Sequence, residues 1–192
     1  PVDLFYSKYL PNISIEMIDN FFFETYKSQI NQTQLFPKLK LFFEFAKQFN
    51  LNLYICSTLD QNILDLATKN LNISEYFKNI YGNCFNKTKS LPSIIESLQL
   101  KKEETIFIGD TPHDIEAGKV AKIQTGAILF GYTDPEIMQN LNPDEIFEST
   151  DDLYFKMTSN FAPNYFQKPI ATVGGLIFDD NNNVLLIRTD KW

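Results

Sequence analysis

The stretch EETIFIGDTPHDIEAG, residues 103–118, constrains the fold of this chain more than any other. Its β-branched and aromatic run TIFI is typical of a buried parallel strand, and the glycine after it leads directly to Asp110. A second acid, Asp114, follows four residues later. Because open α/β sheets bind ligands at the carboxyl edge of their strands, these two carboxylates are candidates to hold a divalent cation.

The same turn also has a purely structural interpretation. Thr111 is a good N-cap, Pro112 fits the first helical position, and Asp114 follows the cap by three residues, where an acid completes a capping box. Capping does not explain Asp110, an acid placed at the strand end behind a glycine. The turn alone therefore leaves both interpretations open.

Composition narrows the classes of partner. The 192 residues are 44% hydrophobic and 21% charged, as in ordinary soluble globular proteins. The net charge of −7 argues against nucleic acid or an anionic membrane as the main partner. Arg188 is the only arginine, so a phosphate site must use lysine, backbone amides and a cation. No protein partner can be deduced.

Location is predicted from what the sequence lacks. It has no signal peptide and no apolar run near 18 residues, so no membrane span is expected. The two cysteines, Cys56 and Cys84, show neither metal spacing nor a disulfide framework, and Cys56 is interpreted as a small buried side chain. We expect a reducing, cytoplasmic compartment.

Periodicity predicts an α/β fold: a Rossmann-like parallel sheet with helices on both faces. Residues 1–36 have apolar residues at helical spacing and form a helical segment, and residues 37–157 alternate helices with short apolar strands. Residues 158–168 break every periodicity and are predicted to be a linker. Residues 169–192 contain two strand-like runs around the turn 179–183, so we expect a β-hairpin that begins a second, truncated domain.

Two more weak signals precede the opening stretch. Ser57 and Thr58 follow the apolar run 51–56, where a hydroxyl and adjacent amides can hold a phosphate oxygen, although either residue could simply cap the next helix. Lys87 and Lys89 precede a helix expected from Leu91. A lysine just before a positive helix N-terminus suits an anion held between the two, although a solvated lysine is the commoner case.

In this order, the three signals resemble the second, third and fourth motifs of the haloacid dehalogenase superfamily, and in particular its phosphoglycolate-phosphatase-like members. The matching text is LYICST at 53–58, KSLPSIIESL at 89–98 and IFIGDTPHDIEAG at 106–118. The resemblance covers about residues 1–157. It implies that residues 1–36 belong to the small helical cap that the family inserts after its first strand.

The resemblance also implies roles and a substrate class. Such hydrolases transfer a phosphoryl group from a small-molecule substrate to an aspartate of a DxDxT motif, with Mg²⁺ beside it. By resemblance, Ser57 holds a phosphate oxygen with Thr58 as its alternative, and Lys89 neutralises phosphate and nucleophile with Lys87 as its alternative. Asp110 is the implied Mg²⁺ ligand, and Asp114 supports that metal site. The chemistry needs these cations, because a dianionic phosphate is repelled by several carboxylates.

The first motif of that family has no counterpart, because no strand followed by D-x-D-G-T precedes the cap segment. The nucleophile and the general acid are therefore missing, the chain is interpreted as a fragment, and we expect it to be inactive. The run IFDDNNN at 177–183 lacks the second Asp at the right spacing and is better explained as a hairpin turn.

Residues 169–192, PIATVGGLIFDDNNNVLLIRTDKW, resemble the first two strands of a Nudix hydrolase domain. The resemblance implies a fusion of two phosphate-cleaving domains. Two alternatives stay open. The first is a non-catalytic phosphate-binding or regulatory module that keeps the fold. The second places the activity of the parent protein in the Nudix half, acting on a nucleoside diphosphate derivative.

Overall fold

The structure is a computed structural model that describes residues 12–159, 170–173, 177–178 and 183–185. Its helices are α2 (Ile15–Gln29), α3 (Leu39–Gln48), α4 (Gln61–Asn70), α5 (Lys87–Ser97), α6 (Pro112–Ala121), α7 (Pro135–Asn140) and α8 (Thr150–Ser159). Its strands are β1 (Gln34–Leu35), β2 (Leu53–Cys56), β3 (Phe77–Tyr81), β4 (Thr105–Gly109), β5 (Gln124–Ile128), β6 (Glu145–Phe147), β7 (Ile170–Val173), β8 (Ile177–Phe178) and β9 (Asn183–Leu185).

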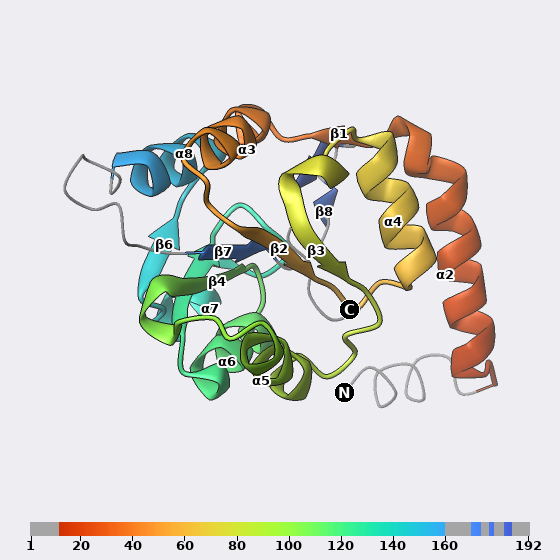
Figure 1. Cartoon of the computed structure of the whole chain (residues 1–192). Coiled ribbons are helices and arrows are strands. Elements are labelled where there is room, and N and C mark those ends of the chain that lie inside the picture. The colour runs from red at the N-terminus through yellow and green to blue at the C-terminus, as the bar shows by residue number, and fades with distance from the viewer. Residues whose placement is uncertain (1–11, 160–169, 174–176, 179–182, 186–192) are drawn as a thin grey trace.

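Six of the strands form one parallel sheet in the order β3-β2-β7-β4-β5-β6. Helices cover both of its faces (Figure 1), with α5 and α6 together on one face and α3 and α8 on the other. The predicted α/β class with a Rossmann-like parallel sheet is therefore confirmed. No helix in the described part of the chain is both long and apolar enough to cross a lipid bilayer.

Strand β4 shows why the sheet needs helices on two sides. All five of its residues are buried, and they alternate between two apolar clusters. Ile106 and Ile108 join the cluster under α3, α4 and α8, while Phe107 joins the cluster under α5 and α6. This is the period-two alternation of a strand, with both faces apolar because both are covered.

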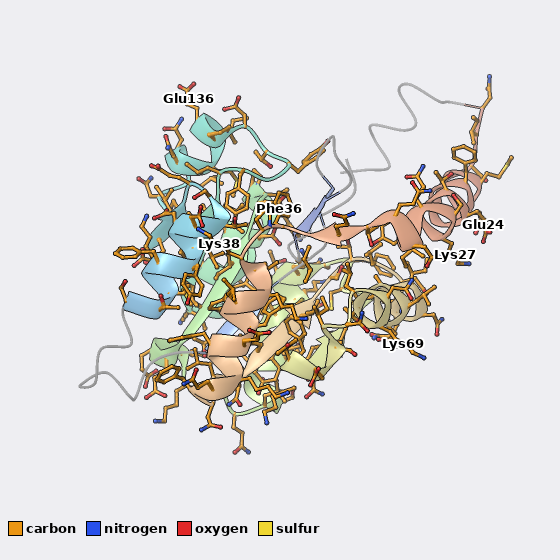
Figure 2. The ribbon with its side chains drawn as sticks, turned by 90° about the horizontal axis from the view of Figure 1, so that it is seen from above. Glu24, Lys27, Phe36, Lys38, Lys69 and Glu136 are labelled. Atoms are coloured by element: carbon orange, nitrogen blue, oxygen red, sulfur yellow. The ribbon has the colours of Figure 1, made fainter. Side chains whose placement is uncertain are left out.

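The described part of the segment predicted to be a cap, residues 12–36, lies beside this sheet. Helix α2 packs next to α4 (Figure 1), and Asn70 of α4 donates a hydrogen bond to Asn31 at 2.9 Å. Figure 2 shows α2, with Glu24 and Lys27, projecting from the body of the molecule. Tyr26 and Ile30 anchor its last turns in the larger apolar cluster. Residues 1–11 of the predicted helical segment lie outside the described residues.

The C-terminal strands differ from the expected arrangement. A hairpin is present, since β8 and β9 pair antiparallel with Ile177 opposite Leu185, but β9 also pairs with β1, and β7 lies between β2 and β4. The physical reason is that the facing edges of two buried strands need hydrogen-bond partners, and the apolar, β-branched β7 supplies them. The division into residues 37–157 and 169–192 stays a prediction, and most of the linker lies outside the described residues.

One boundary error in the prediction matters for the site. Helix α5 begins at Lys87 rather than at Leu91. Asn86 is its N-cap and accepts a hydrogen bond from the Lys89 backbone N–H at 3.2 Å. The predicted start at Leu91 was therefore one turn too late, and Pro92 lies inside the helix.

Candidate active site at the carboxyl edge of the sheet

The turn from β4 to α6 is a capping box. Asp114 Oδ2 accepts hydrogen bonds from Thr111 Oγ1 at 2.9 Å and from the Thr111 backbone N–H at 3.3 Å. Gly109 makes this fit possible, because a Cβ at that position would lie 2.1 Å from the Cβ of Asp114. The structural interpretation of Asp114 is thus confirmed, but it uses only one of the two carboxylate oxygens.

The other oxygen of Asp114 binds Lys87. Lys87 Nζ lies 2.6 Å from Asp114 Oδ1, and both side chains are fully buried. The backbone N–H of Lys87 donates to Nε2 of His113 at 3.3 Å, so the start of α5 is joined to the start of α6 at two points. A buried ion pair keeps its charges only where each has a partner, which is the case here.

Asp110 is the least satisfied group of the site. Its Oδ2 accepts a hydrogen bond from the Tyr132 backbone N–H at 2.8 Å, whereas Oδ1 is buried and has no hydrogen-bond partner among the described residues. Burial, and then the neighbouring charge of Asp114, raises the pKa of Asp110 to about 8. The close approach is possible because Gly131 has no side chain, since a Cβ there would lie 2.3 Å from the Cβ of Asp110.

This arrangement fits a divalent cation at Asp110. The unpartnered Oδ1 offers the hard oxygen ligand that Mg²⁺ prefers, and a nearby positive charge would oppose the desolvation that raises the pKa of this carboxyl. Asp110 and Asp114 alone do not complete a coordination sphere. No group of three or more His, Cys, Asp or Glu side chains suited to a metal occurs in the described ranges, so further oxygen ligands would have to come from outside these two side chains.

The buried polar side chains of the turn after β2, Ser57 and Thr58, are uncharged. Ser57 is fully buried, its N–H donates to the Tyr81 carbonyl at 2.8 Å, and its Oγ accepts from the Leu59 N–H at 3.1 Å. The N-cap of α4 is Asp60, which accepts from Asn62 and Ile63, so neither Ser57 nor Thr58 caps that helix.

The structure brings together most, but not all, of the predicted residues. Ser57, Thr58, Asp110 and Asp114 all follow β2 or β4 at the carboxyl edge of the sheet. Lys89 does not join them, because its side chain is exposed on α5 while Lys87 is buried against Asp114. An Asn three residues before Lys89 is the signal that could have placed the helix start correctly.

Three partners in the site were missed by the sequence prediction. The Tyr132 backbone N–H and the closely approaching Gly131 belong to the loop after β5, and a backbone donor leaves no trace in the sequence. His113 lies within residues 103–118, but the sequence predicted no role for it. Its contact with the Lys87 backbone depends on the packing of α5 against α6, which periodicity does not reveal.

Comparisons with known proteins support this picture. The family model described as haloacid dehalogenase-like hydrolase matches residues 4–128. The chain is 26% identical over 151 residues to the pyrophosphatase PpaX of Oceanobacillus iheyensis, covering 76% of this chain and 71% of that protein. It is 29% identical over 143 residues to the phosphoglycolate phosphatase of Photorhabdus laumondii, covering 72% and 60%. A phosphoglycolate phosphatase of Aquifex aeolicus is 34% identical over 109 residues, which are 52% of this chain and 49% of that one.

Solved structures agree. A haloacid dehalogenase-like hydrolase from Streptococcus pneumoniae superposes with a TM-score of 0.68 at 27% identity, covering 81% of this chain and 75% of that one. A predicted phosphoglycolate phosphatase from Haemophilus somnus gives 0.66 at 19% identity, with 82% and 73% covered, and shows the fold alone. The chain spans between about half and seven tenths of the three curated relatives, so these matches concern part of each protein. The family model covers more than half of the sequence, and the chain belongs to the haloacid dehalogenase-like hydrolase family.

Proposed function

We propose that this chain carries the cation-holding and phosphate-holding part of a Mg²⁺-dependent phosphatase site for phosphorylated small molecules. In the complete site, a phosphomonoester would be hydrolysed through an aspartyl-phosphate. The observation that carries the proposal is the buried, unpartnered Oδ1 of Asp110 beside the buried Lys87–Asp114 pair. Desolvated charge of this kind is costly for a protein that only has to fold, and it is typical of functional sites.

Each side chain has a role that its surroundings allow. Asp110 would bind Mg²⁺ through Oδ1, and Asp114 would fix the position of Lys87 while it caps α6. We assign Lys87 the part predicted for Lys89, since the buried ammonium is the one that can offset the charge of phosphate and nucleophile. Ser57, with Thr58 beside it, would hold a phosphate oxygen. The cation, when bound, neutralises charge that develops on the phosphoryl group.

We further propose that the chain is inactive as it stands. The strand between the two turns, β7, carries only Ile170, Ala171, Thr172 and Val173, and therefore offers no carboxylate to accept a phosphoryl group. No D-x-D-G-T run occurs in the sequence. The same observation favours the alternative of a non-catalytic phosphate-binding module. The gene sequence before Pro1 separates the two, because a strand ending in D-x-D-G-T supports the phosphatase.

Cation binding is tested by titrating Mg²⁺ into the purified chain in a calorimeter. We expect saturable binding that Asp110→Asn weakens at least tenfold. Asp60→Asn is the matched control, since Asn caps a helix as well as Asp does, and it should bind Mg²⁺ like the unaltered chain. Equal binding by all three chains would contradict the assignment of Asp110.

Turnover of p-nitrophenyl phosphate with Mg²⁺ tests the second part. We expect none above a metal-free blank. Turnover that Asp110→Asn abolishes would show that the phosphoryl acceptor is present after all, and would overturn the proposed inactivity.

The Nudix part of the proposal rests on the sequence of residues 169–192 and on the β8–β9 hairpin. In this proposal, the parent protein would hold a second hydrolase domain, and that domain would act on a nucleoside diphosphate derivative. The downstream gene sequence decides, because a GxxxxxE…REUxEExGU box is required. Its absence would remove this part of the proposal and leave the phosphatase part untouched.

A further inference from the structure

The only two cysteines of the sequence, Cys56 at the end of β2 and Cys84 in the loop after β3, lie in one buried cluster at the carboxyl edge of the sheet. Cys56 is the last residue of β2 and pairs in register with Tyr81 of β3. The loop after β3 then turns back, so that the Cys84 N–H donates to the Ser57 carbonyl at 2.9 Å. Both thiols are buried in the same apolar cluster, together with Leu91 and Phe107.

Opposing contacts act on the sulfur of Cys84. Its thiol donates hydrogen bonds to the carbonyls of Gly82 at 3.4 Å and Tyr81 at 3.7 Å, which favour the protonated form, while the neighbouring residues Asn83 and Phe85 are exposed. A hydrogen bond from the Cys56 thiol, and to a smaller extent the charge of Lys87, lowers the pKa of Cys84 to about 7 against the opposing effect of burial. Cys56 is the proton donor of the pair, and this hydrogen bond together with burial raises its pKa.

We propose that Cys56 and Cys84 form a reversible dithiol–disulfide pair whose oxidant is a peroxide. The Cys84 sulfur attacks one peroxide oxygen, the O–O bond breaks, and a sulfenic acid and one water result. The Cys56 sulfur then attacks the sulfenic sulfur, the S–O bond breaks, and the departing oxygen leaves as a second water. Two thiols and one hydrogen peroxide thus give one disulfide and two waters, and an external dithiol reverses the change.

The disulfide would act on the neighbouring site, and this step rests on the proposed function. A disulfide would hold β2 and the loop that carries Cys84 at a fixed sulfur–sulfur distance near 2 Å. Lys87 begins α5 three residues after Cys84, and Ser57 follows Cys56 directly. Oxidation therefore displaces Lys87 and Ser57, the two residues assigned to phosphate. We expect the affinity for inorganic phosphate to weaken at least tenfold.

The experiment uses the whole chain in metal-free buffer with a small excess of hydrogen peroxide, followed by alkylation and intact-mass measurement. Because the sequence has two cysteines, an intramolecular disulfide can have only one connectivity. We expect a monomer that has lost two hydrogens, takes up no iodoacetamide, and recovers both thiols with dithiothreitol. Cys56→Ser should stop at a sulfenic acid that dimedone traps, while Cys84→Ser should react far more slowly.

Several results would overturn the pair. One is that the folded chain keeps two alkylatable thiols after treatment with peroxide, although the same treatment oxidises the chain when it is unfolded in guanidinium. Others are disulfide-linked dimers alone, or a sulfinic acid without a disulfide. Phosphate binding is measured separately by calorimetry. If reduced and oxidised chains bind phosphate equally well, the coupling is wrong. If neither binds, the proposed function fails while the disulfide assignment stands.

Discussion

The two turns at the carboxyl edge of the sheet differ in kind although they occupy equivalent places. At the β4 turn three ionisable side chains are buried together: Asp110 and Asp114 of the turn itself, and Lys87 from the start of α5. After β2, the corresponding buried polar residues are the uncharged Ser57 and Thr58. Both turns lead into a helix with a carboxylate that caps it. Helix capping alone therefore does not need buried charge.

The two turns differ in how deeply their capping acids are buried, and only the β4 turn buries more charge than capping requires. At the β2 turn the capping acid, Asp60, is partly exposed, and the buried groups are small and hydrogen-bonded. At the β4 turn the capping acid is fully buried, and it needs Lys87 to balance its charge. Beside it, Asp110 is left with an unpartnered oxygen. The following predictions probe this difference, beginning with the largest expected effect.

Removing the ammonium of Lys87 should have the largest effect. In Lys87→Met, Asp114 stays buried without a counter-charge, which we expect to lower the free energy of unfolding by about 3–5 kcal/mol. Urea unfolding followed by circular dichroism measures the loss. Lys89→Met is the matched control on the same helix, and its exposed side chain predicts a change within about 0.5 kcal/mol.

A second variant shows whether the loss comes from charge. Lys87→Met combined with Asp114→Asn removes both charges but keeps an oxygen that can cap α6. We expect the double variant to be more stable than Lys87→Met alone. If it is less stable, or if Lys89→Met costs as much as Lys87→Met, then the β4 turn does not depend on the ion pair and the contrast between the two turns fails.

Asp110 should make stability depend on pH in the direction opposite to an ordinary surface aspartate. Its pKa is about 8 in the folded chain and about 3.9 in an unfolded one. Between these values the folded state holds a proton that the unfolded state has released. The contribution of Asp110 is therefore fully present below about pH 4 and is lost as pH rises toward 8, by at most about 1.4 kcal/mol per pH unit.

The measurement is the difference in unfolding free energy between the unaltered chain and Asp110→Asn, followed from pH 5 to pH 8 in EDTA. This difference isolates Asp110 from other titrating groups. We expect the difference in unfolding free energy to shift in favour of Asp110→Asn by roughly 2 kcal/mol over this range, below the maximum slope, because structural relaxation relieves part of the cost of burying the carboxylate. Adding Mg²⁺ should reduce the shift. A difference that does not vary with pH would place Asp110 in contact with water or with a cation of the protein.

Much of the fold follows from the sequence, for reasons visible in particular elements. The buried strands β2 and β4 are short apolar runs, and the caps of α4 and α6 are Asp60 and Thr111, as the capping rules expect. The position of β7 could not be predicted in this way. Its apolar pattern predicts a strand. Its neighbours in the sheet, however, are β2 and β4, which lie more than 60 residues away along the chain, and a local pattern does not identify them.

For the candidate site, position in the fold could be predicted where a polar side chain follows a strand end, as at Ser57, Asp110 and Asp114; their roles stay a prediction. It was predicted less well where helix register decides, as at Lys87 and Lys89. Two residues are enough to turn a lysine from the sheet toward solvent, because neighbouring positions on a helix differ by about 100°. The loop after β5 contributes a backbone N–H, from Tyr132, which only the three-dimensional arrangement reveals.

We expect the smallest change in unfolding free energy in the turn after β2. Ser57→Ala removes the hydroxyl that accepts the hydrogen bond of the buried Leu59 N–H, and we expect a loss of about 1 kcal/mol. Ser57→Thr keeps the oxygen and should recover part of this loss. The stability change should also be independent of pH between 5 and 8, because no charge is involved. A loss of stability as large as that of Lys87→Met would mean that the β2 turn depends on its hydrogen bond as strongly as the β4 turn depends on its ion pair. A small loss in stability together with a large loss in phosphate binding would instead separate the two roles of Ser57, one in folding and one in the site.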